Sequence, residues 1–360
     1  MTEKVCVLIA GNSRMEESVR LKRPNVRIVG ILHDLALVEY VSSEVPVNEL
    51  IIDPEISPRG ETLEQWVSRF NRAYPNVLVT VAGPRTGADT PMTSPRVITS
   101  QTVVIWSPKG GVGKTFIATN LACGAAIASK GKALLLDLDI YSGDVSTYLD
   151  LLDGPTITEM LPELSALRPE GLDKYSQKHG PSGLKVICGP RRLELSSLIT
   201  IEHVRTLISL AEKRWGLLYV DTPPDITSDI VGESIDAASA LVLVITQDVC
   251  ALRQSKVALD IFRKLSISEE SIFVVLNRGA RDSPIPESKV EEYLEKELSA
   301  VIPDDRKEVE RSVFQGRPVV LSTKTDISVA LWGLLSKISP GLPVPETEKR
   351  QTKPRRGLFW

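Results

Sequence analysis

The sequence has few residues of the kinds that bind metals or cross-link small folds. Its 360 residues include only four cysteines and three histidines, all isolated from one another along the chain. That spacing gives neither a zinc site nor a disulfide framework, and it predicts a reducing, cytoplasmic compartment. Each cysteine lies among apolar neighbours, which favours burial of all four thiols.

Long hydrophobic runs and an excess of basic residues are also missing. No apolar run approaches the roughly 18 to 20 residues that a membrane-spanning helix requires, and the longest, around Ala237 to Ile245, has the length of a strand. The N-terminus shows no signal-peptide core or cleavage site, which predicts that the chain is not exported. A formal net charge of −3 argues against a general nucleic-acid binder, although a local basic patch stays open.

Composition shifts along the chain predict two α/β units. Short apolar runs alternate with helical patterns in the first part, which is typical of parallel strand pairing. The stretch that follows is rich in Pro, Gly, Ser and Thr without periodicity, as in a linker. We therefore expect a small domain over residues 1–83, a linker over 84–100, a larger domain over 101–340 and a flexible basic tail over 341–360.

The second segment predicts a mostly parallel, doubly wound sheet. Its strands are almost continuously apolar, as expected of strands covered on both faces. A helix rich in Ala and Leu is expected over Thr115–Ala128. The expected strands are Val103–Trp106, Ala133–Leu136, Leu184–Ile187, Leu217–Val220, Leu241–Ile245 and Ile272–Leu276.

The strongest motif is a glycine-rich turn between a strand and a helix, running from Ser107 to Gly113. Glycines lack Cβ atoms, so such a loop wraps closely and points backbone N–H groups at phosphate oxygens. The following helix adds the positive end of its dipole. In this motif the lysine, here Lys114, reaches the β- and γ-phosphates, and the hydroxyl of Thr115 ligates Mg²⁺. A turn that binds nothing is the plain alternative, and the Lys-Thr pair argues against it.

The loop departs from the general pattern G-x-x-x-x-G-K-[ST], because Pro108 replaces the first glycine and Lys109 precedes the others. In this respect Lys109-Gly110-Gly111-Val112-Gly113-Lys114-Thr115 resembles the deviant Walker A loop of the ParA/MinD superfamily. The resemblance implies a P-loop ATPase that binds ATP and Mg²⁺ through this loop and Phe116. It also implies a homodimer with ATP at the interface, in which Lys109 reaches the partner's phosphates and stabilises their charge. A solvated loop lysine is the alternative.

The resemblance extends to two acidic strand ends. Leu134–Asp139 resembles the superfamily's second strand motif, which implies that Asp139 positions the attacking water and that Asp137 lies nearer the magnesium. Leu217–Pro224 resembles the Walker B strand and its switch turn, which implies that Asp221 holds Mg²⁺ through water. Any one of these carboxylates could simply solvate a strand end, but their order after the loop favours the site.

Farther along, Ile272–Leu276 followed by Asn277 and Arg278 resembles the superfamily's purine-recognition strand. The resemblance implies that the Asn277 amide hydrogen-bonds the adenine edge. The segment around Ile302 and Pro303 matches the superfamily's C-terminal pattern, which implies that Ile302 and Pro303 close over the base. A turn formed by Asn277 after the strand is the alternative.

Before the linker, the order strand, helix, strand, helix, strand over Val5–Asp53 resembles a response-regulator receiver domain, with Asp53 in the place of its phosphoacceptor. Gly11, Asn12 and Ser13 stand where a receiver has acidic metal ligands, and no lysine ends a fifth strand. Phosphorylation would lack charge neutralisation, so Asp53-Pro54 is better interpreted as a turn. We expect a degenerate receiver that serves as a docking or dimerising surface.

A degenerate receiver ahead of a deviant Walker ATPase resembles the TadZ/CpaE-like pilus-assembly ATPases. This layout implies a switch that places a type IV (Flp/Tad-type) pilus or secretion machine at a cell pole or the inner face of the membrane, with slow hydrolysis as the reset. A MinD-like positioning ATPase and a partitioning ATPase on nonspecific DNA remain open alternatives. The basic tail, which ends in Leu358–Trp360, has too few apolar residues for a stable membrane helix, so a solvated disordered end and a weak membrane or partner contact are the alternatives.

Overall fold

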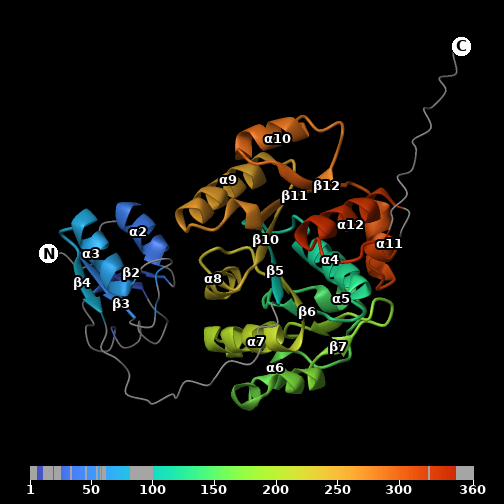
Figure 1. The fold of residues 1–360 in the computed structure, drawn as a ribbon, viewed down its shortest axis with the longest axis horizontal. Helices are drawn as coiled ribbons and strands as arrows, with labels where there is room; N and C mark the ends of the chain where they lie inside the picture. The colour runs from blue at the N-terminus through green and yellow to red at the C-terminus, as the bar shows by residue number, and fades with distance from the viewer. Residues whose placement is uncertain are drawn as a thin grey trace, which may run out of the picture. The chain divides into compact units, whose positions relative to one another are not determined.

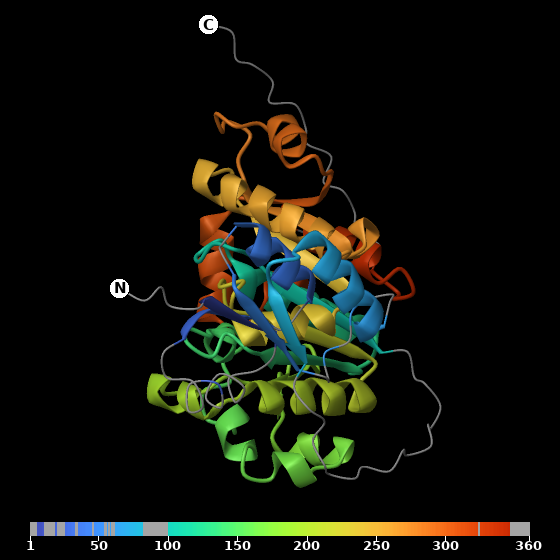
Figure 2. The same cartoon turned by 90° about the vertical axis from the view of Figure 1, so that its left-hand side faces the viewer.

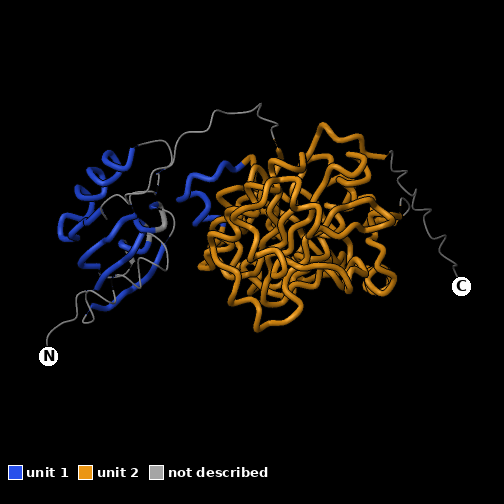
Figure 3. The backbone as a smooth tube through the Cα atoms, turned by 90° about the horizontal axis from the view of Figure 1, so that it is seen from below, with its two compact units in different colours: residues 1–97, 259–269 blue, residues 98–258, 270–360 orange. Residues whose placement is uncertain are grey.

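The chain divides into two compact units in a computed structural model, residues 1–97 with 259–269 and residues 98–258 with 270–360 (Figure 3). The structure describes residues 6–10, 19, 26–32, 35–44, 47–53, 56, 58, 62–81, 100–322 and 325–345. Nearly all of the predicted linker and the tail from residue 346 onward lie outside the described residues. The predicted domain boundaries therefore stay predictions.

The first unit contains a parallel sheet in the order β2-β1-β3-β4. Its elements are β1 (Cys6–Ala10), β2 (Arg27–Leu32), α2 (Leu35–Glu44), β3 (Glu49–Ile52), α3 (Leu63–Ala73) and β4 (Leu78–Val81). Alternate residues of β1 face opposite sides, so Leu8 packs in one buried cluster with Trp66 and Phe70 of α3 while Val7 packs in another. A capping box between Thr62 and Gln65 begins α3.

The turn after β3 lies beside the end of β1. The backbone N–H of Asp53 donates to the Ala10 carbonyl at 2.8 Å, and the Asp53 carbonyl accepts from Ile56 at 3.1 Å. Whether the unit is a degenerate receiver stays a proposal, because strand order alone does not define that family.

The second unit is built on an eight-stranded sheet in the order β12-β11-β10-β5-β9-β6-β8-β7 (Figure 1). Every pairing is parallel except that of the short edge strand β7 with β8. The strands are β5 (Gln101–Trp106), β6 (Ala133–Asp137), β7 (Gln177–Lys178), β8 (Lys185–Ile187), β9 (Leu217–Asp221), β10 (Ala240–Ile245), β11 (Ile272–Gly279) and β12 (Leu298–Pro303). The predicted α/β class with a mostly parallel sheet is confirmed.

Helices follow most of these strands. They are α4 (Lys114–Ala128), α5 (Val145–Tyr148), α6 (Ile157–Met160), α7 (Ile201–Arg214), α8 (Asp229–Asp236), α9 (Val249–Lys264), α10 (Glu287–Leu294), α11 (Arg306–Phe314) and α12 (Asp326–Ile338). Short 3-10 turns lie at Leu164–Ala166, Pro169–Lys174, Leu193–Leu198, Glu269–Ser271 and Val319–Leu321. Figures 1 and 2 both place α10 at the β11–β12 end of the sheet and α6 at the β8–β7 end.

The sheet is buried on both faces. Helices α4 and α12 contact each other and pack in one core with Val103, Ile105 and Tyr219. On the opposite face of the same strands, Val104 and Val220 are fully buried as well. None of the helices in the described part of the chain is long and apolar enough to cross a bilayer.

Two strand predictions need correction. Strand β11 continues to Gly279, so Asn277 and Arg278 lie inside the strand and the alternative of a turn at Asn277 is wrong. Strand β12 was not predicted as a strand, because its segment is only half-buried and its apolar pattern is weak.

Since the main strands are parallel, their carboxyl ends meet at one edge of the sheet, and the residues predicted for the nucleotide site lie at this edge.

Candidate nucleotide site

The phosphate loop joins β5, at the centre of the sheet, to the N-terminus of α4. Gly111 and Gly113 have φ of 75° and 97°, in the left-handed region that side chains disfavour. A Cβ added at Gly113 would lie 2.3 Å from Nδ2 of Asn277, whereas a Cβ at Gly110 would meet nothing within 4 Å. The loop therefore requires glycine at position 113, where β11 closes against it.

The side chain of Lys114 points into a cluster of buried carboxylates. Only 7% of Lys114 is exposed, and its Nζ lies 3.8 Å from Oδ2 of Asp139. The other Asp139 oxygen accepts a hydrogen bond from the Ser142 hydroxyl at 3.0 Å. Asp137 and Asp221 are buried in the same region, at the ends of the paired strands β6 and β9. The structure thus brings together all three aspartates that the sequence singled out.

Backbone groups enclose Asp137. Its Oδ1 accepts the N–H of Asp139 at 3.2 Å, and the N–H of Gly189 also hydrogen-bonds its carboxylate. A Cβ at Gly143 would lie 2.5 Å from both carboxylate oxygens of Asp137. The loop that follows Asp139 is therefore packed directly on this buried acid.

Thr115 and Asp221 form the part of the cluster that fits a magnesium ion. The Thr115 hydroxyl donates to Oδ2 of Asp221 at 2.6 Å, and the buried Oδ1 of Asp221 has no hydrogen-bond partner among the residues that the structure describes. Mg²⁺ is usually held by one or two protein oxygens together with substrate phosphates and water. The described residues contain no cluster of three or more His, Cys, Asp or Glu side chains arranged to hold a metal by themselves. The donor set therefore fits Mg²⁺ that arrives with a nucleotide.

The charges of the cluster are unbalanced in the nucleotide-free state. Burial and the neighbouring Asp139 raise the pKa of Asp221 to about 7, against the opposing effects of the Thr115 hydrogen bond and Lys114. Burial, followed by the charges of Asp221 and Asp139, raises the pKa of Asp137 well above its usual range. Both shifts show that negative charge is unfavourable here, so a bound cation would stabilise the charged form of these carboxyl groups.

Lys109 is paired within its own chain. Its Nζ donates to Oδ1 of Asp248 at 2.5 Å, and the same oxygen accepts the N–H of Ala251 at 2.8 Å in the first turn of α9. The Lys109 hydrogen bond lowers the pKa of Asp248. Both side chains are substantially exposed, at 35% and 48%. The predicted contact of Lys109 with a partner's phosphates stays a prediction, and it would require this pair to open.

A cavity of about 480 Å³ adjoins the loop. Its lining includes six residues that the sequence predicted for nucleotide binding, Gly113, Phe116, Asn277, Arg278, Ile302 and Pro303. The Nδ2 group of Asn277 donates to the Val112 carbonyl at 2.7 Å. That bond fixes the amide and leaves its Oδ1 as the acceptor available to a ligand.

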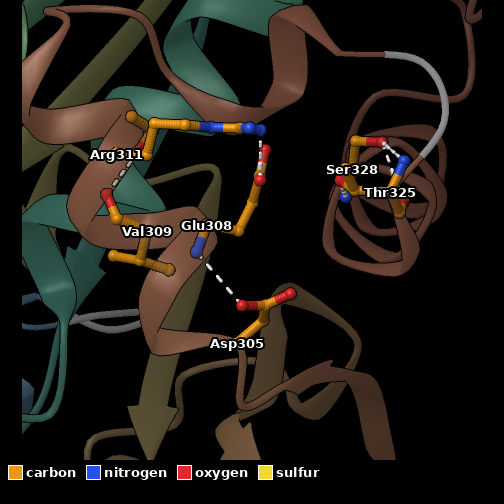
Figure 4. Close-up of polar contacts among 7 residues, drawn as sticks. Asp305, Glu308, Val309, Arg311, Thr325 and Ser328 are labelled. Atoms are coloured by element: carbon orange, nitrogen blue, oxygen red, sulfur yellow. Dashed lines mark hydrogen bonds and ion pairs between the residues drawn. The ribbon is translucent and has the colours of Figure 1, made fainter.

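Other lining residues were not predicted as site residues, namely Tyr148, Asp304, Asp305, Arg306, Val309 and Glu310. Asp305 caps α11 by accepting the N–H of Glu308 at 3.1 Å, which orients the helix beside the cavity (Figure 4). The spacing of Asp305 and Glu308 is a readable helix-start signal. Nothing in the local sequence marks Tyr148.

The cysteines supply no further chemistry among the described residues. Burial raises the pKa of Cys123 and of Cys188 to about 12, which keeps both thiols protonated and unreactive. The prediction that all four thiols are buried is wrong for Cys250, which is exposed in the first turn of α9, and Cys6 is only half-buried.

Comparison with known proteins identifies the family. Residues 103–319, more than half of the chain, match the CobQ/CobB/MinD/ParA nucleotide binding domain, so the chain belongs to this family. An uncharacterized ATP-binding protein of Methanocaldococcus jannaschii is 26% identical over 221 residues, covering 61% of this chain and 80% of that protein.

Two solved structures share the fold. A ParA family ATPase from Chlorobium tepidum TLS matches with a TM-score of 0.60 and 24% identity, covering 65% of this chain and 99% of that one. MinD of Pyrococcus horikoshii OT3, complexed with Mg-ADP, matches with a TM-score of 0.58 and 20% identity, covering 67% and 96%. Sequence relatives also include MinD septum proteins, iron–sulfur cluster carriers and a tyrosine-protein kinase, so similarity leaves the partner open.

Proposed function

We propose that this chain is a Mg²⁺-dependent ATPase that works as a homodimerising switch. The observation that carries the proposal is the buried Lys114 ammonium beside three carboxylates at the end of a glycine-rich loop. A triphosphate on the loop would meet backbone N–H groups, the helix N-terminus and this ammonium. Thr115 and Asp221 would hold Mg²⁺, which neutralises phosphate charge when bound.

For hydrolysis, we assign Asp139 to the attacking water. Asp139 is 5% exposed, and its carboxylate accepts a hydrogen bond from Ser142 and lies beside Lys114. A carboxylate held in this way can orient a water and accept its proton. Loss of this carboxylate should stop hydrolysis without removing the groups that bind the phosphates.

Adenine is the base that the cavity favours. The Oδ1 acceptor of Asn277 suits the N6 amine of adenine, because the Nδ2 group of Asn277 is already bonded to Val112. Guanine presents a carbonyl oxygen at the same edge, which would face another acceptor. We therefore assign ATP as the nucleotide.

The proposed homodimer depends on a contact made by Lys109. This lysine is part of the phosphate loop, and its one ion pair among the described residues is the exposed pair with Asp248. Ion pairs exposed to water are weak, so a nucleotide-bound second copy could compete for the lysine. Lys109 would then add a cation to the phosphates of the partner's ATP.

We further propose that the switch assembles or places a type IV (Flp/Tad-type) pilus or secretion machine, in the cytoplasm at a cell pole or at the inner face of the membrane. The layout supports this proposal, since a small α/β unit with Asp53 after its third strand precedes the ATPase. The matches to MinD proteins favour a second candidate, a MinD-like positioning ATPase that contacts the membrane.

The test is size-exclusion chromatography with light scattering, with and without ATP and Mg²⁺. We expect the wild type to dimerise with ATP and return to monomer as it hydrolyses, and Asp139→Ala to stay a dimer. Lys109→Ala should remain monomeric while still binding ATP, whereas the control Lys132→Ala, an exposed lysine before β6, should behave as the wild type. Monomers in every variant despite bound ATP would refute the switch.

A second experiment separates the candidate functions. ATP-dependent binding to anionic vesicles that disappears on truncation after residue 345 would favour the MinD-like function. Binding to nonspecific DNA that weakens steeply with salt would favour a partitioning ATPase. Neither behaviour, together with ATP-dependent capture of a pilus or secretion component, would favour the TadZ/CpaE-like function.

A further inference from the structure

Helix α5 connects the two ends of the proposed nucleotide site. The segment that follows β6 begins at Asp139, beside Lys114, and reaches the cavity at Tyr148, the last residue of α5. Both ends of this ten-residue segment therefore face places where a nucleotide would lie. No sequence motif assigned a role to Tyr148.

The helix is held from behind by the core. Val145 and Leu149 are buried and belong to the same core cluster as α4, which α5 contacts. Tyr148 lies between them in the sequence but is only half-buried, and it lines the cavity with Phe116 and Asn277. Because two apolar anchors fix the helix, the position of the Tyr148 ring is set by the fold.

The Tyr148 hydroxyl has a hydrogen-bonding capacity that the described residues do not use. No side-chain hydrogen bond of this hydroxyl is found among the described residues, although a half-buried tyrosine usually finds a partner. Arg278, Asp144 and Asp221 act on it electrostatically. The hydroxyl is therefore within electrostatic reach of both Asp221 in the acid cluster and Arg278 in the cavity lining.

The chain between Tyr148 and Asp139 is short, and although residues 141–144 are exposed, it is held by three local contacts. The Tyr148 N–H donates to the Asp144 carbonyl at 2.9 Å, and Gly143 leaves no room for a Cβ against Asp137. Ser142, one residue earlier, donates to the Asp139 carboxylate at 3.0 Å. A restraint on α5 is therefore passed to the carboxylate through backbone packing and one side-chain bond.

We infer that Tyr148 is a positioning residue: it contacts the nucleoside part of bound ATP through its ring and hydroxyl, and thereby fixes the loop that orients Asp139. The inference rests on the proposed ATPase function. If the inference is right, binding of the phosphates alone is not enough. The nucleoside must also fill the cavity before Asp139 supports hydrolysis at the full rate.

The test uses the full chain, with Mg-ATP binding measured by calorimetry and hydrolysis measured under single-turnover conditions. Tyr148→Phe keeps the ring and should weaken ATP binding by about three- to tenfold through loss of one hydrogen bond. Tyr148→Ala should weaken it by at least about tenfold and also lower the hydrolysis rate at saturating ATP. The matched control is Tyr141→Ala, because Tyr141 lies on the same segment, is 62% exposed and does not line the cavity.

Inorganic tripolyphosphate separates positioning from mere structural support, because it fills the phosphate loop and leaves the cavity empty. As a competitor of labelled ATP, it should bind wild type and Tyr148→Ala equally well. Equal losses for ATP and tripolyphosphate would overturn the inference, as would unchanged ATP binding and hydrolysis in both Tyr148 variants. If tripolyphosphate does not compete with ATP in the wild type, the ATP affinity of Tyr148→Phe becomes the test, because this variant keeps the ring and its packing. Unchanged ATP affinity would then overturn the inference. A wild type that binds no ATP would instead refute the proposed function.

Discussion

Three glycines of the phosphate loop allow backbone strain and steric conflict to be measured separately. Gly110 has open space at its Cβ position and is not in the left-handed region, Gly111 has open space but a φ of 75°, and Gly113 has a φ of 97° together with the close approach of Asn277. In the nucleotide-free protein, alanine at position 110 should add neither cost, alanine at 111 should add backbone strain, and alanine at 113 should add strain together with a steric conflict.

The expected magnitudes follow from these contacts. Gly110→Ala should change the free energy of unfolding by less than about 0.5 kcal/mol, or raise it slightly by stiffening the unfolded chain. Gly111→Ala should cost about 1–2 kcal/mol for a left-handed alanine. Gly113→Ala should cost about 2–5 kcal/mol, because it adds the loss of the buried Asn277–Val112 hydrogen bond.

Thermal unfolding without nucleotide is the assay. For a domain of this size, each kcal/mol lowers Tm by roughly 2–4 °C. The double variant Gly113→Ala/Asn277→Ala removes the atom that the new Cβ meets, so it should be less destabilised than the sum of the single variants. A Gly113→Ala protein as stable as Gly111→Ala, or strictly additive behaviour of the double variant, would refute the steric explanation.

Further predictions concern charge and base recognition. Because the folded-state pKa of Asp221, about 7, lies above that of an unfolded aspartate, the nucleotide-free protein holds an extra proton between about pH 4 and 7 and should lose stability as pH rises through that window. Asp221→Asn should flatten this dependence of Tm on pH, and an unchanged slope would contradict the assignment. Asp248→Asn keeps a helix cap and releases Lys109, so the ATP-dependent dimer should tighten by about two- to fivefold in light-scattering dilution series; a weaker dimer would contradict this. Asn277→Ala should lower ATP affinity about tenfold by calorimetry and leave GTP affinity unchanged, and equal losses for the two nucleotides would argue against base selection.

The sequence alone determined the parts of the site that are encoded by neighbouring residues. The glycines, Lys114 and Thr115 are consecutive, and the chemistry of a phosphate loop depends on local backbone geometry. The aspartates could be placed at one sheet edge because each ends a strongly apolar run, and the ends of parallel strands meet. Resemblance to a known family supplied the roles that local chemistry could not.

Only the tertiary structure decided which distant residues meet. Lys109 pairs with Asp248, 139 positions away, and Asn277 donates to Val112, 165 positions away. Such contacts depend on the order of the strands in the sheet, which no local pattern encodes. The same holds for Tyr148, whose place in the cavity follows from the packing of a four-residue helix on α4. Local patterns fixed the kind of chemistry, and long-range packing fixed the surroundings that direct it, because side chains far apart in sequence interact only after the sheet has formed.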